Sequence, residues 1–152
     1  RHRGGDRRRS RIGLSGTATM VVVDTNILAY LLIDGDRTPD AQALYARDPE
    51  WKSESFLLIE FSNVLATYLR AGSLRRSDAH ALLAEAETRV RGLVNLPHSR
   101  ALRVAEQFAV SAYDARFLGA AQTLGARLVT EDARLRAAAP ALTLSLADAL
   151  GR

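Results

Sequence analysis

The sequence predicts an α/β domain built around a parallel β-sheet. Short apolar or β-branched runs alternate with longer helical stretches along residues 20–152, and this alternation is typical of parallel sheets. The 152 residues match the usual length of about one domain. With 47% apolar and 25% charged residues, the composition is that of a globular chain, which excludes a disordered chain or a coiled coil.

The first half of the pattern begins with a strand at Met20–Val23, whose apolar, β-branched residues are typical of a strand buried on both faces. A helical stretch over 25–32 follows directly and is expected to end near residues 34–35. The next helix is expected over Thr38–Arg47, with its threonine as the N-cap and a proline in the first position. Residues 51–55 read as a short strand or extended link, and a longer helix over 57–71 ends before a glycine.

The second half continues the alternation, with Ser99 as the expected N-cap of one helix. The elements expected here, in chain order, are a helix over 77–90, a third strand over 92–96, a helix over 99–110, a helix over 111–124, a strand over 127–130, a short helix from 131, an apolar run over 142–144 and a helical turn over 146–150. Because no repeat or linker divides them, residues 20–152 are expected to form one domain.

The positive charge of the chain is concentrated at its start. Residues 1–19 carry six arginines and one aspartate, whereas the rest of the sequence is nearly neutral. Basic arms commonly bind nucleic acid. However, the only methionine, Met20, stands directly before the first strand, which favours an extension outside the native protein. We therefore expect residues 1–19 to be a flexible, non-native or disordered tail and assign them no function.

Residue types that are absent exclude several classes of site. The chain has no cysteine, which excludes disulfides, cysteine-bound zinc, iron–sulfur clusters and thiol catalysis. Its three histidines show no ligand-like spacing, so metal chemistry would depend on carboxylates, which favour Mg²⁺ or Mn²⁺. No run approaches the ~20 apolar residues of a membrane span. We expect a cytoplasmic protein without a membrane segment.

Four carboxylates stand apart from the acids of ordinary solvated helix faces. Asp24 and Asp132 follow strands, where open α/β sheets bind ligands, Asp114 opens a helix, and Glu60 borders the apolar face of the helix over 57–71. Each has a plainer interpretation: the aspartates can cap helices, and the glutamate can reach solvent or pair with an arginine. If the four converge, they cannot all ionise without a cation between them. A divalent metal there would favour phosphodiester cleavage by activated water.

These residues belong to an ordered set of motifs that resembles a known family. The motifs are Asp-Thr-Asn at 24–26, Glu60 followed by Asn-Val-Leu at 63–65, Ser-Ala-Tyr-Asp-Ala at 111–115 and Leu-Val-Thr-Glu-Asp at 128–132. The set resembles the PIN-domain ribonucleases, in particular the VapC-type toxins of prokaryotic toxin–antitoxin pairs. The resemblance covers essentially residues 20–150.

The resemblance implies a fold, a chemistry and a set of site residues. The family's fold is a parallel sheet of about four or five strands between helices. Its acidic quartet, which binds Mg²⁺ or Mn²⁺, corresponds to Asp24, Glu60, Asp114 and Asp132, with Asp24 and Asp114 as the most direct ligands. Asn26 and Thr130 match supporting positions. Apart from the resemblance, a substrate groove needs basic residues that contact phosphates, and Arg116, two positions after Asp114, is the best candidate; the alternative is that this arginine is solvated or paired with an acid.

The resemblance also implies a substrate and partners. Family members cut single-stranded or structured RNA and leave a 5′-phosphate and a 3′-hydroxyl. VapC-type proteins usually form homodimers and are inhibited by a cognate VapB-type antitoxin that lies across a groove near the site. The apolar sides of residues 27–32 and 57–69 are candidate contact surfaces, and core packing explains them equally well.

Two alternatives remain open, and two are rejected. The chain could be a PIN-domain nuclease of RNA processing or decay without an antitoxin, which a neighbouring antitoxin gene would exclude. It could also be a non-catalytic RNA-binding module, although the presence of all four acids disfavours this. A haloacid-dehalogenase-type phosphatase needs a second aspartate where Asn26 stands, and a Rossmann fold needs a glycine-rich fingerprint after the first strand.

Overall fold

Four short strands form one sheet in the described part of the chain, which in this computed structural model comprises residues 20–152. The expected tail at 1–19 lies outside the described residues. The strands β1 (Val21–Val23), β2 (Trp51–Lys52), β3 (Leu128–Val129) and β4 (Thr143–Leu144) pair in the order β2-β1-β3-β4, and every pairing is parallel. The structure therefore confirms the predicted α/β class with a parallel sheet.

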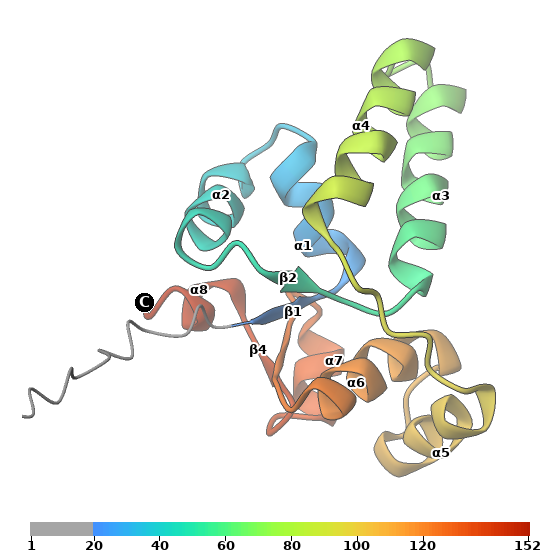
Figure 1. Cartoon of the computed structure of the whole chain (residues 1–152), viewed down its shortest axis with the longest axis vertical. Coiled ribbons are helices and arrows are strands. Elements are labelled where there is room, and N and C mark those ends of the chain that lie inside the picture. The colour runs from blue at the N-terminus through green and yellow to red at the C-terminus, as the bar shows by residue number, and fades with distance from the viewer. Residues whose placement is uncertain (1–19) are drawn as a thin grey trace, which may run out of the picture.

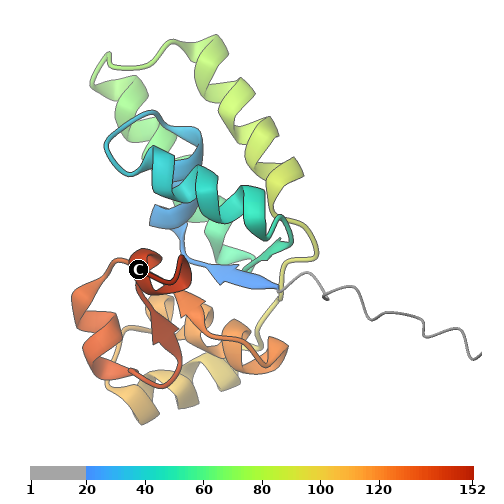
Figure 2. The same cartoon turned by 90° about the vertical axis from the view of Figure 1, so that its left-hand side faces the viewer.

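Helices cover both faces of this sheet. They are α1 (Thr25–Leu32), α2 (Thr38–Arg47), α3 (Phe56–Arg70), α4 (Arg76–Arg89), α5 (His98–Phe108), α6 (Ala112–Leu124), α7 (Ala133–Ala138) and α8 (Leu146–Ala149). Figures 1 and 2 show α1 to α4 on one side of the strands and α5 to α7 on the other. In Figure 1, α3 and α4 form an antiparallel hairpin whose tip extends away from the sheet.

The core lies where the apolar strands meet the inner faces of the helices. The three valines of β1 are buried, as expected for a strand covered on both faces. On α3, Leu57, Phe61 and Leu65 are buried at intervals of four residues, whereas Tyr68, near the end of the helix, is 40% exposed. The last turns of α3 lie away from the sheet, beside α4 in the hairpin (Figure 1).

The strand order places a crevice beside β1. The chain leaves β1 through α1 on one face of the sheet and leaves the neighbouring β3 through α7 on the other (Figure 1). The two strand ends are joined by a hydrogen bond of 3.3 Å from the amide of Asp24 to the carbonyl oxygen of Val129. Ligands of open α/β sheets bind at such a reversal of strand order, outside the carboxyl ends of the strands.

Three local predictions were wrong. The strand expected over 92–96 is reduced to isolated parallel bridges from Trp51 to Val90 and from Glu54 to Val94, because Gly92 has a φ of +65° and interrupts the extended backbone. Pro97, rather than Ser99, occupies the N-cap position of α5, which begins at the next residue.

The third wrong prediction concerns the start of α2. Arg37 occupies the N-cap position, and Thr38 is already helical and buried. The hydroxyl of Thr38 lies 2.6 Å from the carbonyl oxygen of Tyr30 and 3.1 Å from that of Ile33, so it links α2 to the end of α1 by hydrogen bonds.

No helix within residues 20–152 is long and apolar enough to cross a membrane.

Candidate active site

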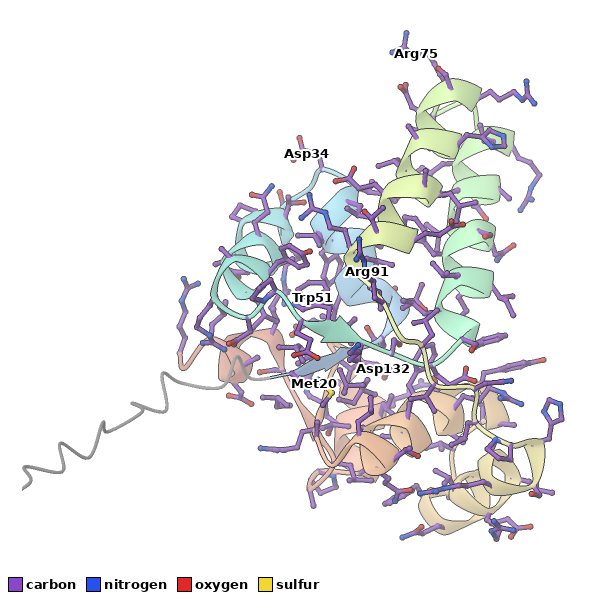
Figure 3. The ribbon with its side chains drawn as sticks, viewed as in Figure 1. Met20, Asp34, Trp51, Arg75, Arg91 and Asp132 are labelled. Carbon is purple, nitrogen blue, oxygen red and sulfur yellow. The ribbon has the colours of Figure 1, made fainter. Side chains whose placement is uncertain are left out.

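A cavity of about 620 Å³ lies at the carboxyl ends of β1 and β3. Its walls come from α1, α3, α6 and the loop that leads into α7, and the lining residues are Asp24, Thr25, Asn26, Phe56, Ile59, Glu60, Asn63, Val64, Tyr113, Asp114 and Asp132. Figure 3 shows Asp132 at the opposite end of β1 from Met20. All four acids predicted for the site, together with Asn26, therefore line one pocket.

Asp24 is held in place from two sides. Its Oδ1 accepts a hydrogen bond of 3.2 Å from the amide of Ile27, which makes it the N-cap of α1, and its Oδ2 accepts a hydrogen bond from the hydroxyl of Thr130. The same hydroxyl accepts a hydrogen bond of 3.1 Å from the amide of Asp132. Thr130 does not line the cavity itself, but it fixes two of the acids that do.

Glu60 reaches the pocket from the half-buried border of α3. Its Oε1 accepts a hydrogen bond of 2.7 Å from the hydroxyl of Thr25, the residue that follows Asp24. Within the described residues it has no ion pair with an arginine, so that plainer interpretation is not realised there. The threonines at positions 25 and 130 thus each orient one carboxylate of the pocket.

The two remaining acids stand at helix starts in different ways. Ser111 is the N-cap of α6, with its Oγ accepting a hydrogen bond of 3.0 Å from the amide of Asp114. Asp114 is therefore not the cap, and its side chain faces the pocket. Asp132 does cap α7, because its Oδ1 accepts from the amides of Arg134 and Leu135 at 2.9 and 3.2 Å. Capping and lining the pocket are compatible for this residue, as they are for Asp24.

The electrostatics of the pocket favour a bound cation. Burial raises the pKa of Asp24 to about 6; the hydrogen bonds from Thr130 and Ile27 oppose this rise, and the charges of Glu60 and Asp132 add to it. Burial also raises the pKa of Asp114, with a further contribution from Asp132. Among the described residues that line the cavity, none is a lysine, arginine or histidine that could neutralise these charges.

The donor set fits a hard divalent cation in an open site. Within residues 20–152, no three carboxylate or imidazole side chains are grouped closely enough to hold a metal ion by themselves. However, Mg²⁺ is usually held by only one or two carboxylates, and water and substrate phosphates complete its coordination. The carboxylate oxygens of this pocket fit that arrangement, and they do not form a closed metal site.

Arg116 differs from its predicted role in phosphate binding. It does not line the cavity, and its side chain is only 16% exposed. Its Nη1 donates to Glu54 Oε1 at 3.2 Å and to the carbonyl oxygen of Leu96 at 3.0 Å, and its Nη2 contacts the ring of His98. Because its guanidinium is occupied by the chain's own acceptors, Arg116 holds α6 against the segment before α5.

Sequence reasoning missed Glu54, the partner of Arg116. This side chain is 1% exposed, and it also accepts hydrogen bonds from the amides of Phe56 at 2.7 Å and Leu96 at 3.3 Å. It therefore joins the start of α3, the 90–97 segment and α6 directly behind the pocket. The available signal was a charged residue between the short run at 51–53 and a strongly apolar helix, a position that favours burial.

Comparisons with known proteins agree with this architecture. Residues 21–140 match the family model of the PIN domain. The chain is 27% identical over 126 residues to a protein of Pyrobaculum aerophilum named Ribonuclease VapC3, an alignment that covers 80% of this chain and 96% of that protein. The crystal structure of PAE2754, from the same organism, superposes with a TM-score of 0.71 at 21% identity and covers 89% of this chain and 98% of that one, which shows a shared fold. The chain belongs to the PIN domain family.

Proposed function

We propose that this chain is a Mg²⁺-dependent endoribonuclease, for which Mn²⁺ can substitute, and the toxin of a type II toxin–antitoxin pair. One observation carries the proposal: four carboxylates from separate segments line one pocket without a cationic side chain among the described lining residues. Such a site repels RNA unless a divalent cation is bound. The name of the relative, Ribonuclease VapC3, supports the same activity and the same type of system.

Each acid has a distinct proposed role. Asp24 and Asp114 would hold the cation directly, while Glu60 and Asp132 complete the negative wall and orient water. Thr130 and Thr25 keep Asp24 and Glu60 in their orientations through the hydrogen bonds described above. When bound, the cation would supply activation of water and neutralisation of charge on the phosphodiester. Asn26, which is exposed in the same pocket, is available to the substrate.

Cleavage of RNA by the purified chain tests the proposal. With total RNA and Mg²⁺ we expect discrete cuts, which EDTA abolishes and which sequencing of the ends can map. Asp24→Asn should lower the rate by about a thousand-fold, the loss expected from several kcal/mol of charge stabilisation. Asp78→Asn, an acid at the start of α4 outside the pocket, is the matched control and should cleave normally. A folded wild-type chain that cuts no RNA with Mg²⁺ or Mn²⁺ would refute the enzyme.

The biological assignment makes separate predictions. We propose that a VapB-type antitoxin inhibits the chain, that the chain forms a homodimer in the cytoplasm, and that residues 20–152 alone carry the activity. Expression should arrest growth, and co-expression of a small protein from the neighbouring gene should restore it. Sedimentation gives the oligomeric state, and a variant that starts at Met20 should cleave RNA as the full chain does. Activity without any neutralising partner would favour a role in RNA processing or decay.

A further inference from the structure

Three aromatic rings form a series from the core to the mouth of the pocket. Phe117 is 3% exposed, and its ring centroid lies 6.3 Å from that of the half-buried Phe56. Phe56 in turn stacks on Tyr113, with centroids 5.2 Å apart and ring planes only 15° from parallel. The inner rings are therefore anchored by packing, and they fix the orientation of the outermost ring.

Tyr113 remains open to solvent in spite of this contact. Its side chain is 63% exposed, which leaves the ring face opposite Phe56 uncovered. A large aromatic side chain gains little stability in such a position, because most of its apolar surface still contacts water. Both Phe56 and Tyr113 line the cavity that contains the four carboxylates.

The position of the ring relates it to the acids. Tyr113 directly precedes Asp114 in the first turn of α6, so the spacing between the ring and that carboxylate is set by one backbone link and by the Ser111 cap. A flat group stacked on Tyr113 would therefore lie beside whatever the acids bind. The exposed amides of Asn26 and Asn63 line the same cavity and offer donors and acceptors to the edge of such a group.

We propose that Tyr113, supported by Phe56, is a stacking platform for an unpaired nucleobase of the nucleotide next to the cleaved phosphodiester. The proposal rests on the proposed function and adds to it the residue that would contact the base beside the cleavage site. A base inside a duplex has both faces covered by its neighbours, whereas an unpaired base can stack on an aromatic side chain. The ring thus selects unpaired nucleotides, and the acids act on the adjoining backbone.

Fluorescent RNA tests the platform independently of cleavage. The probes are single-stranded RNA 12-mers, each with one 2-aminopurine, and the same oligomers annealed to their complements. They are bound to the full chain with Ca²⁺ in place of Mg²⁺, since Ca²⁺ is also a hard cation that takes oxygen ligands. Wild-type protein should quench the fluorescence of the single strands and leave the duplexes unaffected. Tyr113→Ala should weaken binding of the single strands by about 5- to 150-fold, which corresponds to ~1–3 kcal/mol per stacked base at 1.36 kcal/mol per tenfold. Tyr113→Phe keeps the ring and should behave as the wild type does.

A second arm uses the mapped cleavage site. Replacing the base next to the cut with an abasic residue should raise KM for the wild type by a similar factor and leave KM of Tyr113→Ala unchanged, since the stacking partner is already absent. Leu102→Ala removes a 58% exposed apolar side chain on α5 and is the control for loss of surface hydrophobicity.

The outcomes separate the two proposals. Quenching without cleavage by the wild type would retain the platform and refute the nuclease. Cleavage with equal KM for the base-containing and abasic substrates would retain the nuclease and overturn the platform. If Tyr113→Ala instead dissociates a dimer and leaves RNA binding intact, the ring belongs to a protein interface and the platform is again overturned.

Discussion

Two buried carboxylates a few residues from the sheet have opposite surroundings. Glu54, after β2, is 1% exposed and accepts hydrogen bonds from Arg116 and from two backbone amides. Asp24, after β1, is 8% exposed and faces other acids, and its donors within residues 20–152 are one hydroxyl and one amide. The first carboxylate is neutralised by the chain itself. The second lacks a cation among the described residues, and its pKa rises to about 6.

The difference distinguishes an acid whose charge the chain neutralises from one whose charge no described side chain neutralises. Burial of a charge is costly unless it is paired, so the Glu54–Arg116 pair can hold three segments together only because both partners are present. In the pocket, the same cost is left uncompensated in the metal-free chain. The folded protein is therefore less stable there than it could be, and binding of a cation would recover part of that stability.

The largest expected effect follows from breaking the paired region. Arg116→Met leaves the Glu54 carboxylate buried without a cation, and we expect a loss of about 3–5 kcal/mol in the free energy of unfolding. Urea denaturation at pH 7.5 measures this loss. Adding Glu54→Gln removes the orphaned charge and should recover more than half of it. If the double variant is no more stable than Arg116→Met, the pairing of charge is not what stabilises these segments.

The second effect has the opposite sign and concerns the pocket. Asp24→Asn keeps the shape of the side chain and removes its charge, so in EDTA at pH 7.5 the variant should be more stable than the wild type by roughly 2–3 kcal/mol. The pKa of Asp24 is raised from 3.8 to about 6 by folding, so the folded state binds the extra proton between those values.

This shift sets the pH dependence of the wild type. Its stability relative to Asp24→Asn should fall as the pH rises from about 4 to about 7 and then stay constant. In this range the unfolded chain has already released the proton of Asp24, whereas the folded chain binds it, so each rise in pH favours the unfolded chain until both states are ionised. Denaturation at four pH values in this window measures the difference between the two proteins. A difference in stability that does not change with pH would contradict the raised pKa of Asp24. Added Mg²⁺ should raise the free energy of unfolding of the wild type more than that of the variant.

A smaller effect tests the hydroxyl between two pocket acids. Thr130→Val removes the donor to Asp24 and the acceptor for the amide of Asp132, and it should cost about 1–3 kcal/mol at pH 7.5. The loss of that donor should also raise the pKa of Asp24 further, so the upper end of the pH-dependent window should move upward while its lower end, set by the unfolded chain, stays in place. Thr67→Val, at an exposed hydroxyl of α3, is the matched control and should leave the window unchanged.

The smallest effect is expected far from both regions. Arg75 lies at the tip of the α3–α4 hairpin (Figure 3), where it forms an exposed ion pair of 2.9 Å with Asp78. Arg75→Ala should change the free energy of unfolding by less than about 0.5 kcal/mol, because exposed pairs are screened by water. RNA cleavage should also be unchanged. A marked loss of cleavage would show that the hairpin tip contacts the substrate.

Local rules explain why much of the molecule could be predicted. The run before Asp24 predicted β1, and the first helix begins at Thr25 as expected, although it ends at Leu32 and not near Asp34. The helix expected to end at Leu124 does so because Gly125, with a φ of +64°, caps it in the left-handed conformation. Acids that follow strands were expected to meet, since parallel strands end at one edge of a sheet. For these features, interactions between residues that are close in the sequence determine the structure.

Ion pairs and hydrogen bonds between residues far apart in the sequence could not be predicted in this way. Glu131 and Asp132 are adjacent, but Glu131 forms an ion pair with Arg37 and accepts a hydrogen bond from the amide of Leu146, whereas Asp132 lines the pocket. Likewise Arg116 resembled a phosphate ligand until its contact with Glu54, 62 residues earlier, placed it behind the site. The four pocket acids were all identified from the sequence, whereas their catalytic and metal-binding roles remain proposals.

The sequence by itself determined the α/β class, the position of most helices and strands, and which acids gather at the end of the sheet, because periodicity, turn residues and strand ends act over a few residues. Only the tertiary structure decided which buried carboxylate receives a cation from the chain and which does not. That choice depends on the packing of α6 against α3 and the 90–97 segment, and such long-range contacts leave no pattern in neighbouring residues.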